Sequence, residues 1–202
     1  MNKIQAKQVM SFGAEILGIC IDDCPLDELL SRQADKPEYY KDLCCAWLPL
    51  YAIGESKFIW ELLAEKRDCN LPILLCPDDL DFWCAVAVAQ VRHYGDIVVW
   101  EKVGLVTGKI NVESWATSGQ ESRGNWDEEE LRRSWNYFYP YFNDDRNIQW
   151  IDCEKLAFSV QEYESCISVF KENLHAVTKN EVVERNEETG KRRGLFDRIF
   201  RK

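Results

Sequence analysis

The side chains best suited to nucleophilic chemistry are nine cysteines and two histidines. His93 could activate Cys84 or Cys76, because an imidazole that takes the thiol proton creates a reactive thiolate. The cysteine spacings contain no CxxC pair, so they do not indicate a metal site. Most cysteines lie within apolar stretches such as LGICI (17–21), where a reduced thiol behaves as a small hydrophobic side chain. We therefore expect reduced thiols in the core, with no metal and no other cofactor.

Clustered carboxylates are the second group that could carry function. The cluster at 78–81 could attract a hard cation, but it lacks the spacing of a calcium-binding loop. Its acids could instead simply turn the chain between two strands, and the acids at 127–130 suit the positive end of a helix dipole. Acids beside an exposed tryptophan could also form a docking face for a basic protein. The partner-binding residues predicted on this basis are Asp78, Asp79, Asp81, Trp126, Asp127, Glu128, Glu129 and Glu130.

The charge of the chain favours a basic partner. It has 35 acidic and 25 basic residues, for a net charge of −10. Residues 191–202 hold six basic residues and one acid (+5), so residues 1–190 hold 19 basic and 34 acidic residues (−15). Such a body repels phosphate backbones, so we expect no binding to nucleic acid. An acidic surface can also serve solubility alone.

Motifs typical of enzymes are missing from the sequence. The isolated glycines fit no nucleotide-binding fingerprint, and GxSxG does not occur. The sequence therefore predicts a protein that is not an enzyme.

Hydrophobic periodicity predicts interspersed strands and helices. We expect a helix over 25–33 capped by Asp23, and a helix over 55–67 capped by Ser56 with Phe58, Ile59, Leu62 and Leu63 on its apolar face. Further helices are predicted over 127–138, stopped by Pro140, and over 159–176. Strands are predicted over 15–21, 72–76 and 148–151, and a long hairpin over 82–94 and 97–106 turns at Gly95-Asp96.

These elements predict an α+β fold with a single domain. A mostly antiparallel sheet would contain the long central hairpin, with helices packed on it. We expect the globular domain to cover 1–178, a linker to cover 179–190, and a basic amphipathic tail to cover 191–202. That tail could contact an anionic membrane or a partner's groove, or fold back on the acidic body. The sequence has no run of 18 apolar residues and no apolar secretory segment near Met1, so we expect a cytoplasmic protein.

One block of the sequence resembles a known class of proteins. Leu71 to Gly104 contains Cys76-Pro-Asp-Asp-Leu-Asp81, an apolar strand and a return strand with Trp100 to Gly104. This block, about a quarter of the chain together with the fainter segment 150–170, is similar to bacterial immunity proteins of polymorphic-toxin and contact-dependent growth inhibition systems. The resemblance implies a cytosolic protein that blocks a cognate toxin, often a basic nuclease, without catalysis of its own.

The sequence therefore predicts a non-catalytic inhibitor that binds a basic toxin, a nuclease in particular, through an acidic, aromatic surface. Two alternatives stay open at this point. The first is a small cytosolic enzyme that uses Cys84 or Cys76 with His93. The second is a peripheral adaptor that uses the tail at 191–202. The sequence indicates no oligomeric state.

Overall fold

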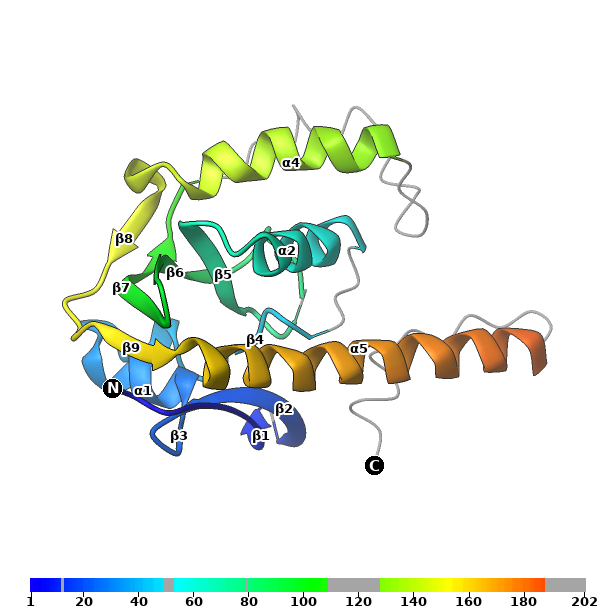
Figure 1. Cartoon of the computed structure of the whole chain (residues 1–202), viewed down its shortest axis with the longest axis horizontal. Helices are drawn as coiled ribbons and strands as arrows, with labels where there is room; N and C mark the ends of the chain where they lie inside the picture. Colours follow the sequence, from blue (N-terminus) through cyan, green and yellow to red (C-terminus); the bar gives the residue numbers. More distant parts are fainter. Residues whose placement is uncertain (12, 49–52, 79, 109–127, 188–202) are drawn as a thin grey trace.

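The computed structural model of the chain describes residues 1–11, 13–48, 53–78, 80–108 and 128–187. It has the α+β fold that the sequence predicts, with two antiparallel sheets and helices packed against them. In Figure 1, α4 lies above β5 and α2 and α5 lies below them, with the β1–β2 hairpin on the far side of α5. No helix within the described residues is long and apolar enough to cross a membrane.

The first sheet is a hairpin near the N-terminus. It contains β1 (Ile4–Ser11), β2 (Ala14–Ile21) and β3 (Cys24–Pro25), in the order β1-β2-β3. The sequence predicted β2 but not β1. Helix α5 runs beside β1 (Figure 1), and a helix along an edge strand keeps other chains from pairing with it.

Helix α1 (Leu26–Gln33) follows β3, and the cap predicted for it is wrong. Pro25 occupies the cap position and makes no side-chain capping bond. Asp23 lies in the preceding turn with a positive φ of 67° and forms an ion pair with Lys7. Lys7 on β1 therefore pairs with the carboxylate that we expected to cap the helix.

The second sheet contains the predicted central hairpin. Its order is β4-β5-β6-β7-β8, and β9 also pairs with β7. Gly95 has a φ of 61° in the tight turn between β6 and β7, which suits glycine. The hairpin begins at residue 86 rather than 82. The strand bounds are β4 Cys44–Cys45, β5 Cys69–Leu75, β6 Val86–Tyr94, β7 Ile97–Val106, β8 Ile148–Trp150 and β9 Leu156–Ser159.

Helix α2 (Ile53–Glu65) begins earlier than predicted. Ser56 therefore lies inside the helix, and its predicted role as a cap is wrong. The predicted apolar face is confirmed, since the four side chains that form it are buried. Short 3-10 helices occur at Pro37–Tyr39 and Asp145–Asn147.

Helix α4 (Glu128–Phe142) continues past the proline that was predicted to stop it. Pro140 lies inside the helix and is exposed. Phe142 is fully buried, with its ring 4.9 Å from that of Phe82. Burial of a phenylalanine is worth about 1.5–3 kcal/mol, which offsets part of the cost of an internal proline.

Helix α5 (Val160–Glu187) is capped at its start by the side chain of Ser159. The Glu162 N–H donates to Ser159 Oγ at 3.2 Å, and the Ser159 hydroxyl donates to the Glu162 carboxylate at 3.1 Å. The helix continues to Glu187, so it enters the range 179–190 that we expected to be a linker. No glycine or proline occurs between 179 and 187 to end it. The tail at 191–202 lies outside the described residues.

Two aromatic groups fill the core. Trp47 and Trp100 are buried against Tyr163 of α5, with ring centroids 6.1 and 6.4 Å from it. On the α4 side, Phe58 of α2 contacts Phe138 of α4 at 5.6 Å. The second group positions the acidic turn described next.

Candidate functional site

The predicted acidic cluster lies in the turn between β5 and β6, which we call the acidic turn (76–85). The Cys76 N–H donates to Ala85 O at 2.9 Å and closes the turn, and the Leu80 N–H donates to Cys76 O at 3.1 Å. Asp78 is exposed. Asp81 is half-buried, and its Oδ1 accepts the Trp83 N–H at 2.9 Å. Asp81 therefore shapes the turn, while Asp78 faces solvent; Asp79 lies outside the described residues.

A buried carboxylate ties the acidic turn to α2. Glu55 is fully buried in the first turn of α2, and its Oε2 accepts the Phe82 N–H at 2.8 Å. This hydrogen bond explains why residue 82 belongs to the turn rather than to the strand. Burial excludes the water that would compete for this hydrogen bond.

Phe82 also joins the acidic turn to α4. Its ring centroid lies 5.0 Å from that of Phe138 and 4.9 Å from that of Phe142, both in edge-to-face geometry. The acids predicted at the start of α4 are Glu128, Glu129 and Glu130, whose side chains lie outside the description, as do Trp126 and Asp127. Residue 128 precedes Phe138 by ten residues, which is about 15 Å along a helix. The structure thus brings the acidic turn to the helix that carries the second predicted acidic group.

Helix α4 presents half-buried aromatic rings that the sequence analysis missed. Trp135 stacks on Tyr139 with ring centroids 5.3 Å apart and planes 14° apart. Tyr137 stacks on Tyr141 at 6.2 Å and 8°. Trp135 itself is half-buried. The available signal was the density of aromatics in residues 135–142, WNYFYPYF, since six rings exceed what one helix face can bury.

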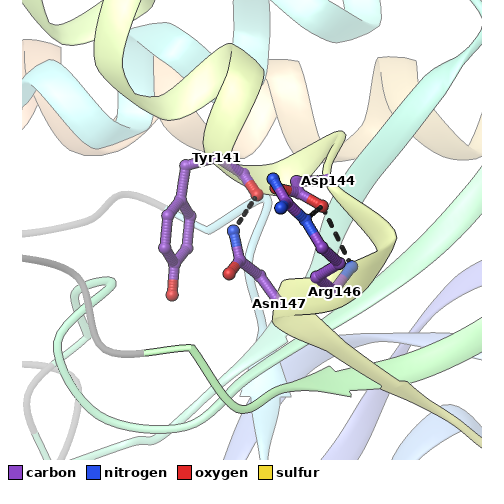
Figure 2. Close-up of polar contacts among 4 residues, drawn as sticks. All are labelled: Tyr141, Asp144, Arg146 and Asn147. Carbon is purple, nitrogen blue, oxygen red and sulfur yellow. Dashed lines mark hydrogen bonds and ion pairs between the residues drawn. The ribbon is translucent and has the colours of Figure 1, made fainter.

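The end of α4 is fixed to the end of β7 by polar contacts (Figure 2). Asn147 Nδ2 donates to Tyr141 O at 3.0 Å, and the Thr107 N–H donates to Asn147 O at 2.8 Å. The Tyr141 hydroxyl donates to Gly108 O, and burial raises the pKa of Tyr141 to about 12, so it keeps this proton. Arg146 pairs with Asp144 through two nitrogens and lowers the pKa of that carboxyl. These bonds set the orientation of α4 on the sheet.

The alternative pairing of His93 with Cys76 or Cys84 is contradicted by the strand geometry. Cys76 lies beside Ala85, and His93 lies eight residues further along the extended strand β6. At about 3.3 Å per residue, the separation is roughly 25 Å. The backbone N–H of His93 donates to Asp68 Oδ1 at 2.9 Å, and the imidazole Nδ1 lies 3.6 Å from the same oxygen.

Burial deactivates most of the thiols rather than activating them. It raises the pKa of seven of the nine, and it raises those of Cys44, Cys69 and Cys166 to about 12. The other four are Cys20, Cys24, Cys45 and Cys153. A thiol with a raised pKa is a poor nucleophile at neutral pH.

The raised thiol pKa values predict a loss of stability at high pH. Above the ordinary thiol pKa of 9.0, the unfolded chain releases protons that the folded chain keeps up to about 12. The contribution of these thiols to the free energy of unfolding is therefore constant below about pH 9 and falls above it, by about 1.4 kcal/mol per pH unit for each such thiol. Urea unfolding below and above that pH measures the slope. Cys166→Ala should make the slope above pH 9 less steep by the contribution of one thiol. An unchanged slope would contradict the raised pKa of Cys166.

Within the described part of the chain, no group of three or more His, Cys, Asp or Glu side chains is arranged to hold a metal ion. Comparisons of the chain with protein-family models, with curated proteins and with solved structures give no match.

Proposed function

We propose that the chain is a non-catalytic inhibitor, an immunity protein, that binds and neutralises a basic toxin. A nuclease is the toxin class that best fits, because its own substrate is an anion and its active-site groove is basic. The binding surface contains the acidic turn and the outward side of α4. The observation that supports it is the contact of Phe82 with both Phe138 and Phe142, which holds an acidic and an aromatic element together.

The charge distribution supports the same proposal. The net charge of −15 over residues 1–190 attracts a basic protein over long range and repels competing nucleic acid. Asp78, being exposed, contributes to this attraction, while Glu55 and Asp81 hold the turn in shape. Half-buried tryptophan and tyrosine rings supply the kind of contact that dominates protein interfaces.

The two alternatives have less support. The separation of His93 from Cys76 and Cys84 leaves the proposed thiol enzyme without its base. The membrane adaptor depends on residues 191–202, which lie outside the described part of the chain. An inhibitor of an intracellular toxin would act in the cytoplasm.

Capture of a partner from the source cells tests the proposal. We expect the immobilised protein to retain one basic protein at low salt and to release it at high salt, because charges set much of the attraction. That protein should be toxic when expressed alone and harmless when co-expressed with this chain. A captured protein whose toxicity is unaffected by co-expression would contradict the proposal.

A further inference from the structure

Helix α4 carries two stacked ring pairs, which we call the stacked pairs: Trp135 with Tyr139, and Tyr137 with Tyr141. In each pair the residues are four apart, so they lie on the same side of the helix one turn apart. All four side chains are half-buried, so each packs against the core and keeps part of its surface in solvent. Trp135 rests on Phe58, with ring centroids 5.2 Å apart. The contact holds the indole in place before any partner arrives.

Partly exposed aromatic rings offer faces on which a planar cation can stack. A guanidinium stacks on an aromatic face and retains hydrogen bonds at its edges, whereas an ammonium is compact and strongly hydrated. The Trp135–Tyr139 planes differ by 14° and the Tyr137–Tyr141 planes by 8°. The stacked pairs therefore favour arginine over lysine among the cations of a basic protein.

The charge near the stacked pairs points to the same ligand. Trp135 contacts Phe58, which contacts Phe82 at 6.1 Å, so the acidic turn lies close to the first pair. Residues 128–133 contain three glutamates and two arginines and add little net charge of their own. The attraction for a cation therefore comes from the acidic turn and from the net charge of the body.

We propose that the stacked pairs bind arginine side chains of the basic partner. This inference rests on the proposed function, since it names the residue type that the inhibitory surface recognises. Aromatic platforms can also stack nucleobases, but the acidic body repels the phosphates that accompany them. Binding to a single-stranded oligonucleotide is therefore an outcome that would overturn the proposal.

Oligoarginine and oligolysine peptides of equal length and charge test the preference, with affinities measured by calorimetry at low salt. We expect oligoarginine to bind about three- to fivefold more tightly, as partly exposed cation–π contacts provide. Trp135→Leu with Tyr139→Leu should reduce the preference, because leucine keeps apolar packing but has no π face and only the Tyr137–Tyr141 pair remains. If the double variant is unstable, Tyr139→Leu alone replaces it in the test and should reduce the preference for oligoarginine by a smaller amount. Tyr94→Leu is the matched control, because Tyr94 is an aromatic 58% exposed at the far end of the hairpin.

The outcomes separate this inference from the proposed function. Equal affinities for the two peptides, both lost at high salt, would overturn the arginine preference and leave the acidic surface intact. The inference would also be overturned if the preference for oligoarginine were unchanged in the Trp135/Tyr139 variant and lost in Tyr94→Leu. Failure of both peptides to bind at low salt would count against the acidic surface itself, and thus against both proposals.

Discussion

Replacing Phe82 by alanine is expected to lower the free energy of unfolding by about 3–5 kcal/mol and to weaken partner binding at the same time. Phe82 is almost fully buried, and its ring packs on Phe58, Phe138 and Phe142. Its loss leaves a cavity between the acidic turn and α4, so the two parts of the binding surface are no longer held together. Urea unfolding gives the stability, and partner affinity is measured where the variant is still folded.

Phe158→Ala is the matched control for that variant. Phe158 is also fully buried, but it packs on Trp100 and Tyr163 on the α5 side of the sheet. The control should lose a similar free energy of unfolding and keep its partner affinity. Equal losses of affinity in the two folded variants would show that binding does not depend on the junction between the acidic turn and α4. Phe82→Leu and Phe158→Leu provide a milder pair if either alanine variant fails to fold.

The second large effect is on association rate. Asp78→Lys with Asp81→Asn is expected to slow association with the basic partner about tenfold at low salt, with a smaller change in dissociation. Asparagine at 81 keeps a side-chain oxygen that can accept the Trp83 N–H, so the turn is retained. The melting temperature should stay close to that of the wild type. The difference in rate should shrink as salt is raised, because surface charges are screened.

Asp96→Lys with Glu154→Gln changes the net charge by the same +3 at other exposed sites and is the control. Asp96 lies at the hairpin tip, roughly 25 Å along β6 from the acidic turn. If both variants slow association equally, net charge rather than the acidic turn steers the partner. A matched loss of thermal stability in the Asp78/Asp81 variant would favour a purely structural role for these acids.

The sequence predicted the elements that local patterns determine. The hairpin around Gly95 follows from alternating β-branched residues on either side of a two-residue turn, and both strands pair as expected. The apolar face of α2 follows from three- and four-residue spacing. Helix α5 follows from the three- and four-residue spacing of its apolar residues, and it begins at Val160, one residue after the predicted start.

The errors occur where distant contacts outweigh local preference. Pro140 should end a helix, but burial of Phe142 against Phe82 keeps the chain helical for two more residues. Asp23 is a good cap by residue type, but Lys7 from another strand takes its carboxylate. Phe82 has strand propensity, yet the buried Glu55 carboxylate holds it in a turn. None of these partners can be identified from a local window.

For the candidate site, the sequence indicated the acids but not what holds them. Asp78 and Asp81 were recognised from their clustering in the sequence. Only the structure shows that Asp81 shapes the turn by accepting the Trp83 N–H, whereas Asp78 is exposed. The stacked pairs were missed because residue types alone do not show which rings of α4 stay partly exposed. Cys76, Cys84 and His93 looked compatible as residue types, and only the length of β6 separates them.

Growth of cells that express the captured toxin tests the central claim most directly. The toxin is co-expressed with the wild-type chain, with the Asp78→Lys/Asp81→Asn variant or with the Asp96→Lys/Glu154→Gln control, at matched protein levels. Neutralisation through the acidic turn predicts full growth with the wild type and the control, and reduced growth with the Asp78/Asp81 variant. Full protection by all three chains would contradict the assignment of the binding surface, and protection by none would contradict the inhibitor function.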